Sequence, residues 1–308
     1  MRNNKKKFIS ETFFVIFSMV SVFAGVRLAN KIKYESIGQS IEIEMDKPKN
    51  IGFVNALVMG LDGNGARTDS IMFMSFNGYK KKLNIISIPR DTRVLIGKKF
   101  QKINAALEIG KQEVKKGKIN DPQELMIKKV KEIIGLQIHY FASVDFKGFR
   151  NIVDILEGID FDVPDIEGNG KGMNYNDSYQ NLKIHLKPGF QHLNGEQAEG
   201  LVRYRRGYID ADLGRIKIQQ NFVREFAKQK LKPKYLTIIK KLYEEAKENV
   251  QTNYTLFDLV KHIPMIKKFN PEDISSFQVP GKSVFVEGVW YFIPDLKETR
   301  KIINENFR

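Results

Sequence analysis

The chain has 308 residues, of which 42% are hydrophobic, so it can bury a sizeable core as one large globular domain or two small ones. It contains no cysteine, which excludes disulfides, thiolate catalysis and thiolate-bound metals. Its formal net charge of +15 favours anionic partners: nucleic acid, an anionic membrane surface or a phosphorylated substrate.

The N-terminus has the features of a membrane anchor. Residues 1–7, MRNNKKK, are a basic tail, and the apolar stretch that follows over 8–29 is long enough for a membrane-spanning helix. A basic flank stays in the cytoplasm while the remaining chain crosses. We therefore expect a single-pass anchor in the cytoplasmic membrane, a polar juxtamembrane linker over 30–50 and an extracytoplasmic domain over 51–308.

A cleaved signal peptide is the alternative, because Ala24 and Gly25 are small, although no clean A-x-A site is present. With either topology the bulk of the chain lies outside the cytoplasm. This argues against nucleic acid as the anionic partner and against ATP as a freely available substrate. An envelope regulator that binds DNA would need a cytoplasmic basic domain, and only seven residues precede the apolar stretch.

Strands and helices alternate along the rest of the chain. Short aliphatic and aromatic runs bounded by turn residues predict strands, and apolar residues at helical spacing predict helices. The helix over 121–134 has a candidate N-cap at Asp121 and is ended by Gly135. The alternation predicts the α/β class, a single αβα sandwich with a mixed central sheet. Trp290 falls in the last strand pair and is expected in the core. The predicted strands are 55–61, 70–76, 83–88, 139–145, 161–164 and a pair within 283–293; the other predicted helices are 146–158, one that begins at 194, 213–230 and 234–248; and 165–181 is predicted to be a loop.

Two aspartates flank a Gly-rich loop, LDGNGARTD. Asp62 follows an apolar strand, where α/β folds often place site residues, and Asp69 closes the loop. Two carboxylates brought together by a loop can hold Mg²⁺, which prefers oxygen ligands and often bridges to substrate phosphates. Arg67, beside Asp69, suits such a phosphate. The alternative is a hairpin loop in which Asp and Gly simply make the turn.

A second polar cluster follows the strand LNIISI. Arg90 and Asp91 come directly after it in IPRDTRV, where Pro89 fixes the chain. Lys102 and Asn104 lie in QKINAAL, where a helix begins, and a lysine can contact phosphate as a point charge. A surface salt bridge, a turn and a solvated lysine are the alternative explanation of these residues.

The most basic motif reads QAEGLVRYRRGYIDADLGRIKIQQ. Arg203 and Arg205 have the period-two spacing that puts both on one face of a strand. Arg215 and Gln219 are one turn apart on the helix that follows, and Asp212 is a lone acidic anchor among the arginines. Arginine donates hydrogen bonds to phosphate oxygens in pairs and stays charged near neutral pH. The motif predicts an arginine-lined pocket for a polyanion; a solvated charge run is the alternative.

Other chemistry has little support in the sequence. The four histidines are scattered, with no H-E-x-x-H or other metal-ligand pair, which argues against a zinc hydrolase. The chain also has neither a P-loop nor a G-x-S-x-G elbow.

Taken in order, five segments resemble the LytR–CpsA–Psr family: VMGLD…RTDSIMFMSFN, LNIISIPRDTRV, KINAALEIG, IGLQIHYFASVDFKGFRNIVDILEGIDFDVP and LNGEQAEGLVRYRR…DADLGRIKIQQNFV. The similarity runs from about residue 55 to 225. Family members are membrane-anchored enzymes of bacterial envelopes. They transfer a glycopolymer from a polyprenyl-pyrophosphate lipid to a cell-wall acceptor, usually peptidoglycan, and leave a phosphodiester link. The implied fold is a single α/β sandwich with the lipid tail buried between the sheet and the helices.

The resemblance also implies roles for individual residues. Asp62 and Asp69 match the carboxylates associated with Mg²⁺, and Asn104 lies with Lys102 in the family's K-I-N motif. The short loop between the two aspartates departs from the family, which concerns loop geometry more than the phosphate pocket. The catalytic candidates are Arg90, Asp212 and Asp91, and the residues expected to bind the pyrophosphate are Arg67, Arg90, Lys102, Arg203, Arg205, Arg215 and Gln219.

The main hypothesis is an Mg²⁺-dependent phosphotransferase that binds a polyprenyl-pyrophosphate-linked glycopolymer and an envelope acceptor. Nucleic acid is not expected as a partner. Mg²⁺ and the arginines would stabilise the charge that develops as polyprenyl phosphate leaves, and Asp212 or Asp91 would take the proton of the acceptor. The alternative is a non-catalytic receptor for anionic polyprenyl-phosphate lipid or wall polymer. It would use the same arginines, and the carboxylates would have no metal role.

Overall fold

The computed structural model describes residues 52–63, 65–177, 182–208, 211–230, 249–255, 258, 261–262 and 269–308. The predicted anchor, the linker and the helix predicted over 234–248 lie outside these residues. Among the described residues, no helix is both long enough and apolar enough to cross a membrane. The described chain forms two compact units: unit 1 is drawn from the stretch 144–274, and unit 2 from the stretches up to 143 and from 275 to 308.

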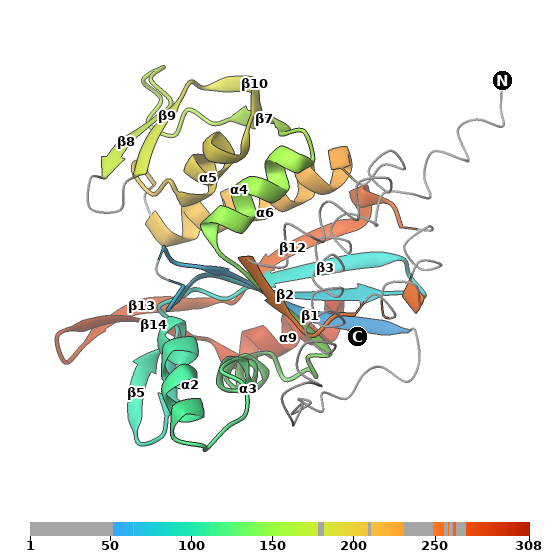
Figure 1. Cartoon of the computed structure of the whole chain (residues 1–308), viewed down its shortest axis with the longest axis vertical. Coiled ribbons are helices and arrows are strands. Elements are labelled where there is room, and N and C mark those ends of the chain that lie inside the picture. The colour runs from blue at the N-terminus through green and yellow to red at the C-terminus, as the bar shows by residue number, and fades with distance from the viewer. Residues whose placement is uncertain are drawn as a thin grey trace, which may run out of the picture. The chain divides into compact units, whose positions relative to one another are not determined.

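The sheet of unit 2 contains an antiparallel meander of three strands (Figure 1), namely β1 (Phe53–Leu61), β2 (Thr68–Asn77) and β3 (Lys82–Ser87). β6 (Tyr140–Val144) lies beside β1 and β12 (Ile274–Gln278) beside β3, which gives the order β6-β1-β2-β3-β12. Both faces of the strands are buried, as expected for a sheet between layers. These strands confirm the sequence-based prediction of a mixed α/β fold with a central sheet.

Three helices belong to unit 2: α2 (Ala106–Lys115), α3 (Gln123–Ile134) and α9 (Leu296–Asn306). Apolar side chains of α3 and α9 join those of β1 and β2 in one buried cluster, so the two helices cover one face of the sheet. Gly135 ends α3 with a φ of 73°, a left-handed conformation that glycine adopts without steric cost. The predicted N-cap is displaced by one residue: Pro122 is the N-cap, and Asp121 Oδ1 accepts a hydrogen bond from the Gln123 amide at 2.8 Å.

Two hairpins complete unit 2. One consists of β4 (Arg93–Ile96) and β5 (Lys99–Lys102), followed by the 3-10 turn η1 (Ile103–Ala105); the other consists of β13 (Gly281–Val286) and β14 (Val289–Pro294). The second confirms the strand pair predicted within 283–293. The prediction that Trp290 is a core residue is wrong, because its side chain is 60% exposed on this hairpin.

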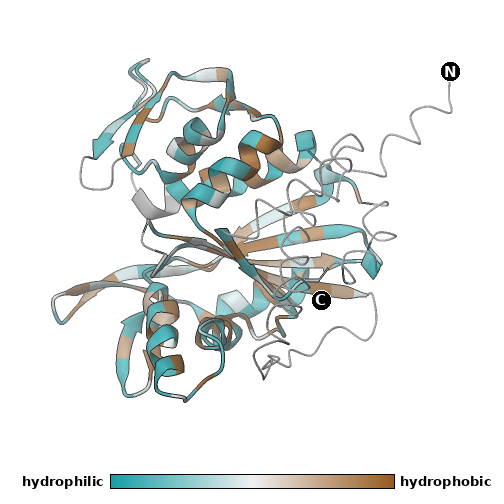
Figure 2. Cartoon of the chain, viewed as in Figure 1, coloured by the Kyte–Doolittle hydropathy of each residue, from teal (hydrophilic) through white to brown (hydrophobic). Residues whose placement is uncertain are grey.

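In the described part of unit 1, three helices pack against short strands. The phenyl rings of Phe149, Phe161, Phe222 and Phe226 form its aromatic core, with ring centroids 5.3 to 6.4 Å apart. Figure 2 shows the hydrophobic residues concentrated on one side of α4 and along the central strands. The elements are α4 (Phe146–Ile155), β7 (Ile159–Val163), β8 (Met173–Asp177), β9 (Leu182–Leu186), β10 (Gly189–Leu193), α5 (Gly195–Arg203), α6 (Ala211–Lys230), β11 (Val250–Thr252) and η3 (Pro271–Asp273).

Two sequence-based predictions in unit 1 are wrong. The segment 165–181 is not only a loop, because β8 lies within it and pairs with β9 in an antiparallel hairpin; its Asn-rich composition hid the alternation. Arg203 does not lie on a strand. It is the last residue of α5, whose capping box between Asn194 and Gln197 starts a helix that runs on past Gly200.

Candidate functional site

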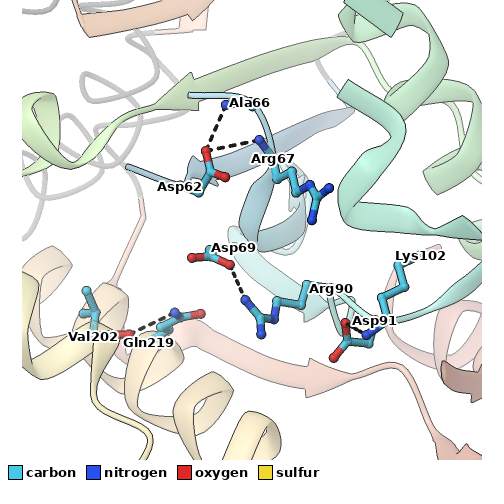
Figure 3. Close-up of polar contacts among 9 residues, drawn as sticks. All are labelled: Asp62, Ala66, Arg67, Asp69, Arg90, Asp91, Lys102, Val202 and Gln219. Carbon is cyan, nitrogen blue, oxygen red and sulfur yellow. Dashed lines mark hydrogen bonds and ion pairs between the residues drawn. The ribbon is translucent and has the colours of Figure 1, made fainter. Parts of the chain in front are cut away.

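The loop between β1 and β2 is shaped by Asp62. Its Oδ1 accepts hydrogen bonds from the backbone amides of Ala66 at 2.9 Å and Arg67 at 3.2 Å, as Figure 3 shows. Helix α2 holds the same loop from outside: Glu108 forms an ion pair with Arg67, and Lys111 donates to the Gly65 carbonyl at 2.6 Å. Asp62 therefore does form the turn, as the alternative explanation of this loop predicts. Both bonds to Asp62 use Oδ1, which leaves Oδ2 able to coordinate a cation.

Asp69 and Arg90, two candidate site residues, form an ion pair. Arg90 follows β3 and Pro89, and its Nη1 donates to Oδ1 of Asp69 in β2 at 2.5 Å (Figure 3). Each side chain is 24% exposed, so the pair lies at the surface of unit 2 but is partly shielded from water. The carboxylate fixes the orientation of the guanidinium, and a guanidinium has five N–H donors. A preoriented arginine of this kind suits a phosphate oxygen.

The remaining candidates of unit 2 surround the start of η1. Lys102 Nζ lies 2.9 Å from Asp91 Oδ1, and both side chains are 30% exposed. The Asn104 amide donates to the Arg90 carbonyl at 3.1 Å, which ties the K-I-N motif to the Arg90 segment. Arg67 is 57% exposed and faces Glu108 rather than Asp69. Its role as a phosphate ligand stays a prediction.

The fit of a magnesium ion depends on Asp62 and Asp69. No group of three or more His, Cys, Asp or Glu side chains that could hold a metal occurs among the described residues. Mg²⁺ usually keeps several waters and takes only one or two protein carboxylates together with substrate phosphates. The chemistry of the two aspartates therefore fits Mg²⁺ brought with a pyrophosphate better than a metal held by the protein alone.

In unit 1 the arginine motif is organised by a buried carboxylate. Glu199 on α5 has a side chain only 4% exposed, and it accepts from Arg203 at 2.5 Å and from Arg150 on α4. The Arg203 guanidinium also lies over the Phe146 ring, 4.1 Å from its centroid. The buried carboxylate therefore holds two guanidinium groups in place. The Arg203 side chain is thus fixed by Glu199 and Phe146 and is not part of a solvated charge run.

Two tyrosines define the segment between α5 and α6, which also contains Arg205. The rings of Tyr204 and Tyr208 pack edge to face, 6.4 Å apart. Burial, followed by the neighbouring Tyr204 phenol, raises the pKa of Tyr208 well above its usual value, so its hydroxyl stays protonated at neutral pH. A Cβ atom at Gly214 would lie 2.2 Å from the Tyr208 ring, which explains glycine in the first turns of α6.

Helix α6 carries the last three candidates. Arg215 is buried, with 2% of its surface exposed, and Gln219 Nε2 donates to the Val202 carbonyl near the end of α5 at 3.1 Å. The predicted helical face of Arg215 and Gln219 is confirmed, since both lie one turn apart in α6. Asp212 lies in the first turn of α6, and its side chain is outside the described residues.

The sequence analysis missed Glu199 and Arg150. The signal for Glu199 is its spacing of four residues from Arg203, which places the two on one helical face once both are assigned to α5. Arg150 comes from α4, more than forty residues earlier, and no local pattern connects it with Glu199.

Comparisons with known proteins agree with this architecture. TagV of Bacillus subtilis (strain 168), described as a polyisoprenyl-teichoic acid–peptidoglycan teichoic acid transferase, is 28% identical over 270 residues, which cover 84% of this chain and 65% of TagV. TagU of Bacillus cereus (strain AH820), with the same description, is 30% identical over 252 residues, or 79% of this chain and 74% of TagU. The crystal structure of B. subtilis TagV matches with a TM-score of 0.66 at 26% identity, covering 84% of this chain and 98% of that one.

The chain thus spans less than two-thirds of the full length of TagV. The sequence model described as the LytR_cpsA_psr family matches residues 19–308, which is most of the chain. The resemblance inferred from the motifs is confirmed: the chain belongs to the LytR_cpsA_psr family.

Proposed function

We propose that this chain transfers a glycopolymer from a polyprenyl-pyrophosphate carrier to a hydroxyl group of peptidoglycan, outside the cytoplasm and anchored by residues 8–29. The observation that carries the proposal is the Asp69–Arg90 pair, a partly shielded arginine held in place at the end of β3. The names of TagV and TagU, which describe teichoic acid transfer to peptidoglycan, support the same class of reaction.

The reaction needs charge stabilisation more than covalent catalysis. The acceptor oxygen attacks the phosphorus that bears the glycopolymer, the bond from that phosphorus to the bridging oxygen breaks, and polyprenyl phosphate departs with the electron pair. The acceptor proton goes to a base. Negative charge grows on the leaving phosphate, and an arginine already oriented by a carboxylate stabilises it without reorganising. Arg90 has this role in the proposal.

The two carboxylates of unit 2 have separate tasks. Asp62 and Asp69 would hold Mg²⁺, and when bound the ion supplies further neutralisation of the pyrophosphate. Asp69 also keeps Arg90 in place, so its loss affects both the cation and the guanidinium.

The proposal keeps Asp91 and Asp212 as the two candidates for the base that takes the acceptor proton. Asp91 Oδ1 lies 2.9 Å from Lys102 Nζ, so Asp91 also holds the lysine in place.

The test is a reconstituted transfer reaction. The full chain in detergent is mixed with a saccharide linked to polyprenyl pyrophosphate, solubilised peptidoglycan strands and Mg²⁺, and the products are analysed by mass spectrometry. We expect polyprenyl phosphate and a phosphodiester-linked peptidoglycan product in equal amounts. Arg300→Lys, at an exposed position of α9, is the matched control for Arg90→Lys and should retain the parent rate. Binding of the donor without release of polyprenyl phosphate would instead identify a receptor.

A further inference from the structure

The β13–β14 hairpin exposes large apolar side chains near its turn. Phe285 is 56% exposed, Trp290 is 60% exposed and Val289 is 38% exposed. Phe285 and Trp290 are direct cross-strand partners, and their ring centroids are 5.3 Å apart. Exposed aromatic pairs of this size are uncommon unless they contact a partner.

The hairpin is held firmly at its base. The Phe292 amide donates to the Asp91 carbonyl at 2.9 Å, and the Phe292 ring is buried against the backbone at Gly281. At the other end, Glu287 and Gly288 have φ values of 49° and 81°, the pattern of a tight two-residue turn. Figure 1 shows the turn lying beyond α2 and β5 of the same unit. The exposed rings are therefore presented on a short, fixed projection.

The β4–β5 hairpin extends this surface. Leu95 and Phe100 are cross-strand partners and are 46% and 50% exposed. The Arg93 guanidinium lies 3.6 Å from the Phe100 ring centroid and 5.7 Å from that of Tyr291, so it joins the two hairpins. Figure 2 shows hydrophobic residues on both hairpins. Together they form an aromatic surface, defined here as residues 93–102 and 281–294.

The charges of the aromatic surface have one predominant sign. It contains five basic residues and a single acidic one, Glu287 at the turn. Lys98, Lys99 and Lys282 are exposed beside the apolar side chains. A second copy of the same surface would be repelled, and an anionic partner is favoured.

We propose that the aromatic surface docks onto an anionic lipid bilayer. Trp, Tyr and Phe settle at the level of the lipid headgroups, and neighbouring lysines are attracted to anionic lipids. Exposed rings also suit a sugar, but the five basic residues of the surface against a single carboxylate favour the anionic bilayer. This inference concerns the orientation of unit 2 on the membrane and does not rest on the proposed reaction.

Trp290 is the only tryptophan of the chain, so its fluorescence reports on this surface alone. The full chain is placed in vesicles of phosphatidylglycerol and phosphatidylcholine, with or without bromine atoms on the acyl chains near the headgroups. We expect Trp290 emission at shorter wavelength than in detergent, and strong quenching by the brominated lipid. Emission typical of a water-exposed indole, without quenching, would overturn the proposal.

Two variants separate docking from general proximity to the lipid. Neutralising Lys98 and Lys99 to Gln should lower the ratio of docked to undocked protein about fivefold for each lysine in anionic vesicles. Tyr79 is 75% exposed at the β2–β3 turn, at the opposite end of β3 from the segment that leads to β4, and serves as the matched control. In Tyr79→Trp combined with Trp290→Phe the new indole should not be quenched.

Three results would contradict membrane docking. Equal quenching at position 79 would mean that the surface has no preference for the lipid. A shift of Trp290 emission caused by soluble peptidoglycan fragments, without quenching by brominated lipid, would identify a glycan site. If Trp290 emission instead moves to shorter wavelength as the protein self-associates at higher concentration, the partner is a second copy of the chain.

Discussion

The two arginine clusters differ in how deeply their carboxylates are buried. In unit 2, Arg90 pairs with Asp69, and both side chains are 24% exposed. In unit 1, Arg150 and Arg203 share Glu199, whose side chain is 4% exposed. Solvent therefore reaches the first pair, whereas the second cluster is built around a buried carboxylate.

The difference in burial gives the two clusters different roles: one positions an arginine, and the other stabilises the fold. A partly exposed ion pair contributes little to stability, so conserving its geometry matters chiefly for what the arginine contacts. A buried carboxylate must be compensated, because an unpaired charge in the interior is costly. We therefore expect changes at Asp69–Arg90 to affect activity, and changes at Glu199 to affect stability first.

The largest effect is expected for Arg90→Ala. Loss of one preoriented donor to a developing negative charge typically lowers turnover about a hundred- to a thousandfold. The free energy of unfolding should fall by less than about 1 kcal/mol, because the pair with Asp69 is partly solvated. Transfer rate and chemical denaturation of the same preparation check both. A loss of stability that accounts for the lost activity would make Arg90 a structural residue.

Glu199→Gln should have the next largest effect, and on the opposite property. It leaves Arg150 and Arg203 facing each other without the carboxylate between them, and Arg203 is only 13% exposed. We expect the free energy of unfolding to fall by about 3 kcal/mol. Glu196→Gln, on the exposed side of the same helix, should cost less than about 1 kcal/mol. Equal stability of the two variants, measured by urea denaturation, would show that the cluster is not a folding element.

A smaller effect is expected for Arg203→Lys. Lysine keeps the charge beside Glu199 but loses the planar fork and its stacking on Phe146. If Arg203 also contacts the pyrophosphate, affinity for a polyprenyl pyrophosphate should fall roughly tenfold. Arg206→Lys, at an exposed neighbouring position, is the matched control. Binding is measured by calorimetry in detergent. If both variants bind like the parent protein, the arginine motif is a solvated charge run.

The sequence predicts those features that depend on contacts between residues close together in the chain. The strands around Asp62, Asp69 and Arg90 are local apolar runs, and their positions were predictable. The pair between Asp69 and Arg90 joins β2 to the segment that follows β3, and the antiparallel register of β2 and β3 brings the two together.

The errors arise where long-range contacts decide the structure. The spacing of Arg203 and Arg205 predicts a strand, yet α5 extends to Arg203, where Glu199 and Phe146 hold its side chain. The aromatic neighbours of Trp290 in a predicted strand favour a core position, since no local pattern distinguishes a buried strand from a projecting hairpin. That the arginines of both units bind the same pyrophosphate stays a prediction.

The smallest expected effect, at Asp62, separates its two possible roles. Asp62→Asn keeps an Oδ1 acceptor for the amides of Ala66 and Arg67, so the loop should remain folded, with a change in stability below about 0.5 kcal/mol. The substitution removes the negative charge that a hard cation needs. We expect a higher Mg²⁺ concentration for half-maximal transfer and an unchanged rate at saturating Mg²⁺. Asp62→Ala loses the acceptor as well, and should lower both stability and the saturated rate. An unchanged Mg²⁺ requirement in Asp62→Asn, with the loop intact, would assign Asp62 to the turn alone and leave Asp69 as the carboxylate that meets the cation.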